Sequence, residues 1–295
     1  MSRTGFYWHE RCFWHDQGAI GVFSAPGEFL QPQAASESPE SKRRLKNILE
    51  VSGLIDELHV VKPAAASLTD LLRFHTPRYL DELQAGDKAG GGNGGDCAPY
   101  MPGSWAAATQ SAGLAIAAVE AVALGEVSNA YALCRPPGHH AEADQGRGFC
   151  LLGNIPVAVM RARALGQANR VAILDWDVHH GNGQQAAFYT EPEVFTVSMH
   201  QAANYPLETG GFDEQGEGAG LGANLNLPLP PGCGLGAYAY AMEKLVLPAL
   251  EAFKPDLIVV ACGYDACAKD PLGKMLLNSQ AFATMTGQLK ALAER

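Results

Sequence analysis

Two uninterrupted apolar runs constrain this sequence more than any other feature. Residues 171–174 read VAIL and residues 257–261 read LIVVA, and neither run alternates polar with apolar side chains. Strands that are buried on both faces have this pattern, which is typical of a parallel sheet covered by helices. Parallel strands need long crossover connections, so the runs point to an α/β fold.

Helical patterns separate the strand candidates along the whole chain. The expected strands are residues 5–8, 130–133, 171–174, 194–198 and 257–261. Cap signals at Ser38 and Ser67 begin two helices, and further helices are expected over 104–124, 154–165, 236–253 and 279–294. The Gly-rich residues 86–103 and 201–222 are expected loops. We therefore predict a single α/β domain over residues 1–295, with a mostly parallel, multi-stranded sheet flanked by helices.

The charge and hydropathy of the chain argue against nucleic-acid and membrane partners. The chain holds 21 Lys and Arg against 31 Asp and Glu, a net charge of −10, and acidic residues surround its one dense basic cluster at 42–44. A nucleic-acid-binding domain usually carries a basic stripe, so we expect no direct nucleic-acid partner. We also expect no secretory leader and no apolar run near the ~20 residues that cross a bilayer, which predicts a cytoplasmic protein with no membrane partner. The seven cysteines include no C-x-x-C pair, which argues against a disulfide framework.

Acidic and imidazole side chains follow both buried runs. Asp175, Asp177 and His179 come directly after residues 171–174, and side chains two apart share one face of an extended chain. Open α/β sheets place their ligands outside the carboxyl ends of the strands, where these residues would crowd unless a cation binds. Asp265 follows the run at 257–261, and together with Asp177 and His179 it gives three protein ligands. Three protein ligands leave one coordination position open for water or substrate, which is the pattern of a catalytic zinc site. A polar turn with capping aspartates is the alternative.

A second polar segment, Arg135-Pro-Pro-Gly-His-His140, follows the expected strand at 130–133. Pro-Pro-Gly forces a rigid turn, which presents His139 and His140 beside each other at a strand end. Imidazoles titrate near neutral pH and suit general acid–base work, whereas a loop whose histidines only bond backbone is the alternative.

The order of these motifs resembles the zinc-dependent histone deacetylase superfamily, which also contains acetylpolyamine amidohydrolases and acetoin-utilisation proteins. The nearest resemblance is to the class II-like bacterial histone deacetylase-like amidohydrolases, and it runs from about residue 4 to the end. The remaining matching segments are Gly148-Phe-Cys150, Val197-Ser-Met-His200, Gly263-Tyr-Asp265 and Asp270-Pro-Leu-Gly273.

The resemblance implies an arginase/deacetylase-like fold and a role for each matching residue. One Zn²⁺ per chain would be bound by Asp177, His179 and Asp265, with iron as the alternative metal. The implied catalytic residues are His140 as general base and acid, His139 as its electrostatic partner, Asp175 paired with His139, and Asn182 orienting His140. The implied substrate-binding residues are Asp96, Gly148, Phe149, Tyr205 and Leu272, with Tyr205 standing where family members often carry Phe. The implied structural K⁺ site consists of Asp175, Asp177, His179, Ser198 and Met199.

One departure from the family pattern concerns the C-terminal part. Family members carry Gly-Gly-Tyr, or Gly-Gly-His, after the next strand, and its side chain stabilises the oxyanion of the tetrahedral intermediate. Residues 1–295 contain no such segment, so we expect the domain to be truncated at the C-terminus. Loss of one oxyanion donor typically costs ~10²–10³ in turnover, so the activity of the 295-residue chain is open.

The resemblance implies a metal-dependent deacetylase, a hydrolase acting on linear amide C–N bonds. Its substrate would be an acetylated lysine in a peptide or protein, or an acetylated small amine. An acetylpolyamine deacetylase, a two-metal ureohydrolase and a catalytically weak acyl-lysine-binding protein are the alternatives, and a homo-oligomer is left open. The acyl length and the physiological substrate are not determined by these residues.

Overall fold

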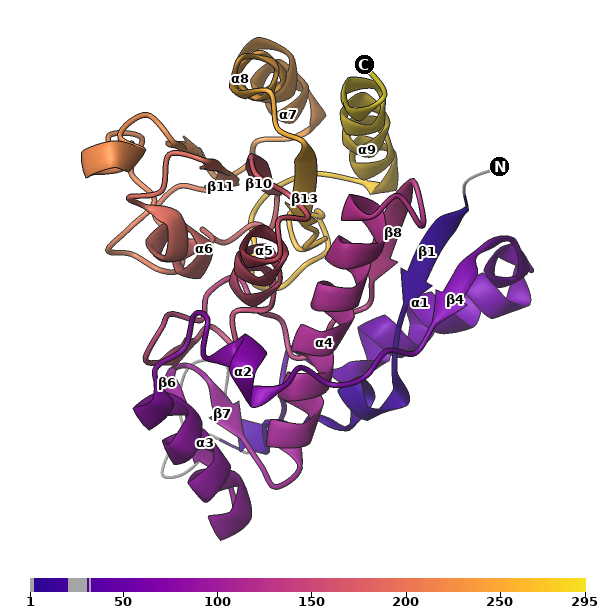
Figure 1. Ribbon diagram of the computed structural model, residues 1–295, viewed down its shortest axis with the longest axis vertical. Coiled ribbons are helices and arrows are strands. Elements are labelled where there is room, and N and C mark those ends of the chain that lie inside the picture. The colour runs from indigo at the N-terminus through magenta and orange to yellow at the C-terminus, as the bar shows by residue number, and fades with distance from the viewer. Residues whose placement is uncertain (1–2, 21–30, 32) are drawn as a thin grey trace. The chain divides into compact units, whose positions relative to one another are not determined.

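The computed structural model describes residues 3–20, 31 and 33–295 (Figure 1). The chain divides into two compact units, Met1–Gln167 and Ala168–Arg295. Each unit contains a parallel sheet with helices packed against it, so the α/β class is confirmed. Whether the two units behave as one domain, and whether a C-terminal part is missing, stay predictions.

The first unit is built on a three-stranded parallel sheet in the order β4-β1-β8. These strands are β1 (Thr4–Tyr7), β4 (His59–Val61) and β8 (Asn129–Ala132). The helices of the unit are η1 (Glu10–Trp14), α1 (Pro39–Val51), η2 (Leu54–Glu57), α2 (Leu68–Leu71), α3 (Pro77–Ala89), α4 (Ser104–Ala123) and α5 (Asn154–Ala164). Its two-residue strands are β2 (Ala19–Ile20), β3 (Gln33–Ala34), β5 (Gly92–Asn93), β6 (Gly95–Asp96), β7 (Pro99–Tyr100) and β9 (Gly146–Arg147).

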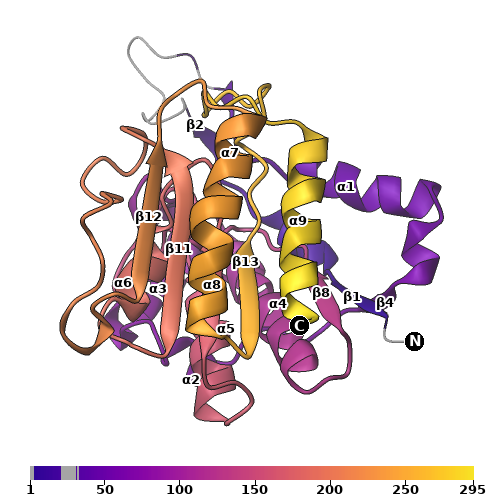
Figure 2. The same ribbon diagram turned by 90° about the horizontal axis from the view of Figure 1, so that it is seen from above.

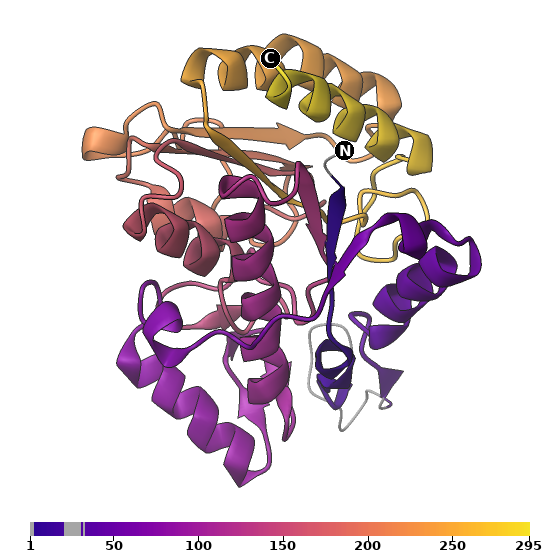
Figure 3. The same ribbon diagram turned by 45° about the vertical axis from the view of Figure 1, so that its right-hand side comes forward.

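Helix α4 is the centre of the first unit. It lies against β1, β8 and α5 (Figure 3), and most of its side chains are buried. Among the described residues it is the one helix that is long and apolar enough, by length and composition, to cross a membrane, yet 72% of that stretch is buried inside the structure. The helix contains Thr109, Gln110, Ser111 and Glu120, so it is not the uninterrupted apolar run that the sequence was expected to lack. Its many alanines keep the mean hydropathy high. A helix buried to this extent is typical of the core of a folded protein.

The second unit carries both of the continuous apolar runs. They form β10 (Val171–Asp175) and β13 (Leu257–Ala261), which pair in parallel, and the four-stranded order is β12-β11-β10-β13. The other two strands are β11 (Val194–Gln201) and β12 (Asn224–Leu229). The helices are α6 (Asn182–Phe188), η3 (Gly218–Gly220), α7 (Leu235–Ala241), the π-turn η4 (Met242–Val246), α8 (Leu247–Phe253) and α9 (Ser279–Ala293).

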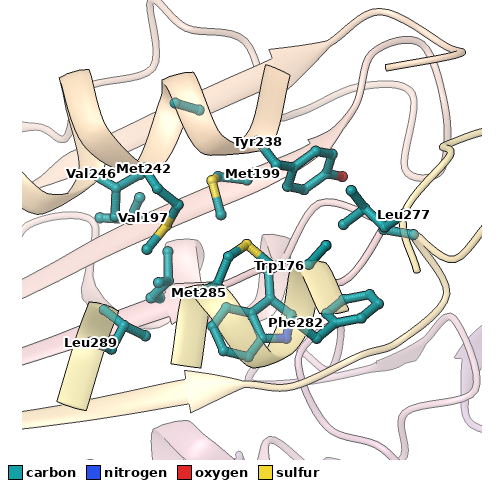
Figure 4. Packing of buried hydrophobic residues seen from close by; sticks show 14 of the residues in the cluster. Trp176, Val197, Met199, Tyr238, Met242, Val246, Leu277, Phe282, Met285 and Leu289 are labelled. Atoms are coloured by element: carbon teal, nitrogen blue, oxygen red, sulfur yellow. The ribbon is translucent and has the colours of Figure 1, made fainter. Parts of the chain in front are cut away.

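Helices α7, α8 and α9 pack against one face of this sheet, as Figure 2 shows. Their core joins Trp176, Met199 and Tyr238, which are nearly or fully buried, to side chains of α9 such as Phe282 and Met285 (Figure 4). Trp176 follows β10 directly, so this packing fixes the chain at the point where the polar segment 175–182 begins. Each large apolar side chain buried here stabilises the fold by roughly 1.5–3 kcal/mol.

The predicted strands and helices are present, but the structure contains further elements. Helices α3 and α6 and strands β4 and β12 were not expected, and the predicted helix over 236–253 is interrupted by the π-turn at Met242–Val246. Pro248 has no N–H and cannot continue an unbroken α-helical ladder, which is consistent with the wider turn just before it. The predicted loop 86–103 begins with the end of α3 and contains β5, β6 and β7. Residues 201–222 form no long element, as predicted.

Candidate functional site

Three predicted metal ligands of the second unit lie together. Asp177 and His179 follow β10, and Asp265 follows β13, the strand that pairs with it. One donor atom from each of the three residues lies within 4.8 Å of the other two. Nδ1 of His179 is 3.0 Å from Oδ1 of Asp177 and 2.9 Å from Oδ2 of Asp265. These two carboxylates and one imidazole form a compact donor set at the carboxyl edge of the sheet.

The electrostatics of this cluster favour a bound cation. Burial raises the pKa of Asp265, and the neighbouring Asp177 carboxylate raises it further, to about 7. Burial alone would lower the pKa of His179, but its hydrogen bonds to the two carboxylates outweigh that and raise it to about 10. Half-buried carboxylates at this distance are unfavourable unless positive charge lies between them. Oxygen and imidazole donors fit a divalent metal such as zinc.

Backbone hydrogen bonds to the aspartates shape the segment that follows β10. The N–H of Asp177 donates to Oδ1 of Asp175 at 3.0 Å, and the N–H of His179 donates to Oδ1 of Asp177 at 2.8 Å. Asp175 is fully buried, and its Oδ2 accepts a bond from Nε2 of Gln184 at the start of α6. Asn182, predicted to orient His140, is buried as the first residue of α6.

The two adjacent histidines belong to the first unit. His139 and His140 are 9% and 3% exposed, and their ring centroids lie 3.9 Å apart. The N–H of His140 donates to Sγ of Cys150 at 3.5 Å. Before the histidines, the carbonyl of Pro136 accepts bonds from Ser111 at 2.8 Å and Asn154 at 3.1 Å, so the turn is held at both ends.

The start of the histidine turn is held by a buried arginine. Arg135 is 1% exposed, and its Nε donates to Oε1 of Glu37 at 3.1 Å. Its Nη1 donates to the carbonyl of His15 at 2.7 Å. Lys42 also contacts Glu37 at 3.0 Å, so Glu37 compensates two cations and its pKa is held below the usual range although burial opposes this.

Three predicted substrate-binding residues form one structure in the first unit. Asp96 in β6 pairs with Arg147 in β9, and Gly148 and Phe149 follow directly. The N–H of Gly148 donates to the carbonyl of Asp96 at 3.0 Å, and the N–H of Phe149 donates to the carbonyl of Cys97 at 2.8 Å. The structure thus brings Asp96 next to Gly148 and Phe149, which are far from it in sequence.

The other two predicted substrate-binding residues belong to the second unit. Tyr205 lines a cavity of about 300 Å³, together with His180, His200 and residues of the loop 201–213. Leu272 is half-buried, and its carbonyl accepts a bond from Nδ2 of Asn204 at 3.3 Å. Tyr205 and Leu272 are therefore carried by loops that touch each other.

The residues predicted to hold K⁺ also gather in the second unit. Asp175 of β10 and Ser198 of β11 are register partners, and Met199 follows in β11. Asp177 and His179 continue from β10. The hydroxyl of Ser198 is 2.9 Å from Nδ1 of His200.

Sequence reasoning missed a buried polar network next to the metal donors in the chain. Nδ1 of His180 is 2.8 Å from Oγ1 of Thr209, and its Nε2 is 3.1 Å from Oε1 of Gln185. Nε2 of Gln185 in turn donates to Oε2 of Glu214 at 2.6 Å. The network fastens the loop 201–213 to α6. The one signal for it was the polar run Gln184-Gln185 at the start of a helix.

A parallel α/β sheet with a three-donor cation site at its carboxyl edge, in a chain that also holds a pair of buried imidazoles, is the architecture of a metal-dependent hydrolase. The comparisons with known proteins are more specific. A model of the histone deacetylase domain family matches residues 36–295. This chain belongs to the histone deacetylase family, whose members are hydrolytic deacetylases.

Individual relatives agree with the family. The chain is 50% identical over 296 residues to the histone deacetylase-like amidohydrolase of Pseudomonas aeruginosa, covering 99% of this chain and 78% of that protein. The crystal structure of the HDA15 HD domain matches with a TM-score of 0.91 at 31% identity, covering 100% of this chain and 82% of the other. The acetylpolyamine aminohydrolase structure from Burkholderia pseudomallei matches with a TM-score of 0.87 at 30% identity, covering 98% and 90%.

These matches confirm the resemblance, the fold class and the deacetylase class predicted from sequence. The family is generally zinc-dependent, and the donor set Asp177, His179 and Asp265 suits one metal ion. A catalytically weak binding protein is the less favoured alternative, because the relatives carry the names of hydrolases.

Proposed function

We propose that this chain hydrolyses the acetyl amide of lysine side chains, or of similar N-acyl amines, at a single zinc ion. The observation that carries the proposal is the convergence of Asp177, His179 and Asp265, whose donor atoms lie within 4.8 Å of one another after two paired strands. The family match and the amidohydrolase and aminohydrolase relatives support the same reaction class.

The donor set fits zinc in number and in kind. Two carboxylates and one imidazole are three protein ligands, which leave a coordination position for water or substrate. When bound, zinc supplies Lewis-acid polarisation of the amide carbonyl and lowers the pKa of its bound water. The two carboxylates also explain the electrostatics of the site, because both retain their charge most easily beside a cation.

We assign proton transfer to the histidine pair. His140 would take a proton from the attacking water and later give one to the amine leaving group. The neighbouring His139 imidazole, whose ring centroid is 3.9 Å away, would tune the charge of His140. Both rings are largely buried. Asp175 and Asn182 are proposed to orient the two imidazoles.

We assign recognition of the acyl-lysine to five residues. Gly148, Phe149, Tyr205 and Leu272 would contact the aliphatic stem, and Asp96 would accept hydrogen bonds from backbone amides on either side of the acetylated lysine. The support for Asp96 is its half-exposed carboxylate beside the Gly148–Phe149 turn. A carboxylate accepts several hydrogen bonds at once and suits this task.

Acetylated polyamines are the second candidate substrate. The structural likeness to an acetylpolyamine aminohydrolase favours them, as does the net charge of −10. Acetate release from an acetyl-lysine peptide and from acetylspermidine, each followed to a kcat/KM value, compares the two. A higher value for the peptide supports the main proposal, a higher value for acetylspermidine supports the second candidate, and release from neither overturns the function.

Two further proposals concern the ion content and the cellular compartment. A structural K⁺ would lie by Asp175, Asp177, His179, Ser198 and Met199, supported by the register of Asp175 with Ser198. A cytoplasmic location is supported by the cysteines, because all seven are free, as is usual in reducing compartments.

A further inference from the structure

Arg147 lies at the junction of the proposed substrate-binding residues of the first unit. It is the register partner of Asp96 in the parallel pair β6–β9 and immediately precedes Gly148 and Phe149. Its strand partner Asp96 and the two residues that follow it, Gly148 and Phe149, are proposed to bind substrate.

The guanidinium of Arg147 connects two carboxylates. Its Nη2 is 3.3 Å from Oδ2 of Asp96, and its Nη1 is 3.0 Å from Oε1 of Glu142. The Arg147 side chain is only 11% exposed, whereas that of Asp96 is 50% exposed. A largely buried, planar guanidinium therefore holds a carboxylate that reaches into solvent. Its second contact, with Glu142, fixes the plane of the guanidinium and hence the direction from which Nη2 meets Asp96.

The backbone around this ion pair is held by contacts across the β6–β9 pair and not by local preference. Cys97, Gly148 and Phe149 all have positive φ angles, of 55°, 49° and 67°. For Cys97 and Phe149 this left-handed conformation is unfavourable, so neighbouring contacts must maintain it. The N–H groups of Gly148 and Phe149 provide them, since they donate to the carbonyls of Asp96 and Cys97. These two hydrogen bonds tie the backbone at Asp96 to the backbone at Phe149.

We propose that Arg147 is a positioning residue for substrate binding, which fixes the Asp96 carboxylate in the orientation that accepts substrate backbone amides and keeps it in register with Phe149. This proposal rests on the proposed function, and specifically on the role of Asp96. It predicts that Arg147 matters for substrates that carry peptide N–H groups beside the acetylated amine. An acetylated alkylamine has no such groups and gains nothing from a fixed Asp96.

The experiment compares two substrates across four variants of the zinc-loaded protein. The substrates are an acetyl-lysine peptide and N-acetylbutylamine, and the variants are Arg147→Gln, Arg147→Lys, Asp96→Asn and the double variant Arg147→Gln/Asp96→Asn. We expect Arg147→Gln to raise KM for the peptide by about 3- to 10-fold with little change in kcat, and to leave KM for N-acetylbutylamine unchanged. Arg147→Lys should lie between wild type and Arg147→Gln.

The double variant and a matched control complete the test. If Arg147 acts through Asp96, the double variant is no worse than Asp96→Asn alone. Arg44→Gln makes the same chemical change at an 80% exposed arginine that pairs with Glu40, and it should leave both KM values unchanged. Equal effects of Arg147→Gln on both substrates, or additive effects in the double variant, would overturn the proposal.

A separate readout distinguishes this proposal from the proposed function. If wild-type protein hydrolyses neither substrate, the function fails, and calorimetric binding of the acetyl-lysine peptide to the same variants then decides the role of Arg147. Weaker peptide binding in Arg147→Gln, with no further loss in the double variant, supports it. Unchanged peptide binding in Arg147→Gln contradicts it.

Discussion

The N–H of Val178 donates a hydrogen bond of 2.8 Å to Oδ1 of Asp265. Val178 lies between Asp177 and His179 on the segment after β10, whereas Asp265 follows β13. The backbone of one ligand-bearing segment thus positions the carboxylate of the other. Because β10 and β13 are parallel neighbours, the pairing of these two apolar strands is what brings the three donors together.

The Asp265→Asn variant should separate metal binding from folding. The asparagine side chain keeps an oxygen that can accept the Val178 bond but removes one negative charge, so we expect zinc affinity to fall by at least about 100-fold. The free energy of unfolding of the metal-free protein should be unchanged or higher, because one of two crowded carboxylates is gone. Chelator competition followed by metal analysis measures the first quantity, and urea unfolding measures the second. Wild-type zinc affinity in this variant would show that Asp265 is no ligand.

A methyl group added at Gly263 should disturb the site without changing any ligand. The Cβ of an alanine there would overlap Oδ2 of Asp177 and come within 2.6 Å of its Cγ. We expect Gly263→Ala to lower zinc affinity by about 10-fold or more through the displaced carboxylate. Gly287→Ala in α9 is the matched control, because its Cβ meets nothing within 4 Å, and helix propensity should stabilise it by up to about 1 kcal/mol. Equal zinc affinities in the two variants would be evidence against the expected crowding.

Loss of the His140 imidazole should stop catalysis while zinc stays bound. We expect His140→Ala to lower kcat by about 10²–10⁴, the usual range for general acid–base groups. The backbone bond from residue 140 to Cys150 does not involve the imidazole, so the turn should persist. His59→Ala, at an exposed position of β4, is the control and should keep full activity. Near-normal acetate release by a zinc-loaded His140→Ala protein would remove His140 from the mechanism.

His75 should make the first unit less stable in mild acid. Burial lowers its pKa to about 4, and its Nε2 accepts a bond from the N–H of Gly153 at 2.9 Å, which requires the neutral ring. The unfolded chain binds a proton near pH 6.5 and the folded chain only near pH 4, so stability falls as the pH drops through this window. From these two pKa values the loss between pH 7.5 and pH 5 is about 2 kcal/mol.

Urea unfolding at both pH values, for wild type and His75→Gln, measures this contribution. The variant should start less stable at pH 7.5 but lose about 2 kcal/mol less on acidification. Identical pH dependence of the two proteins would mean that His75 is not the titrating group.

Strands β10 and β13 could be predicted because their sequences carry the signal directly. The runs at 171–174 and 257–261 form these two strands, with bounds within one residue of the prediction. Only β10 is fully buried as expected, whereas residues 258–260 of β13 are half-buried. Strand β12 was missed because Asn224, Asn226 and Pro228 are residues typical of turns, although Leu225, Leu227 and Leu229 alternate with them. In the structure, Nδ2 of Asn224 and Nδ2 of Asn226 both donate to Oε1 of Gln185, a tertiary partner that the local sequence does not show.

The site residues also divide into those that local sequence reveals and those that only the fold brings together. Asp177, His179 and Asp265 could be singled out because their spacing places them at strand ends, which is a property of the local chain. The link between Asp96 and Arg147 could not, because they are 51 positions apart in the sequence and only the β6–β9 pairing brings them together. Similarly, Glu214 lies in a predicted loop, and its buried contact with Gln185 depends on the folded path of residues 201–213.

The most direct test of the account is the zinc requirement of acetate release. Metal-free protein is titrated with zinc while hydrolysis of an acetyl-lysine peptide is followed. We expect activity to rise linearly to a plateau at one zinc per chain, and Asp265→Asn to show no activity at one equivalent. Full activity in the metal-free protein, or a plateau reached only at two zinc ions per chain, would contradict it.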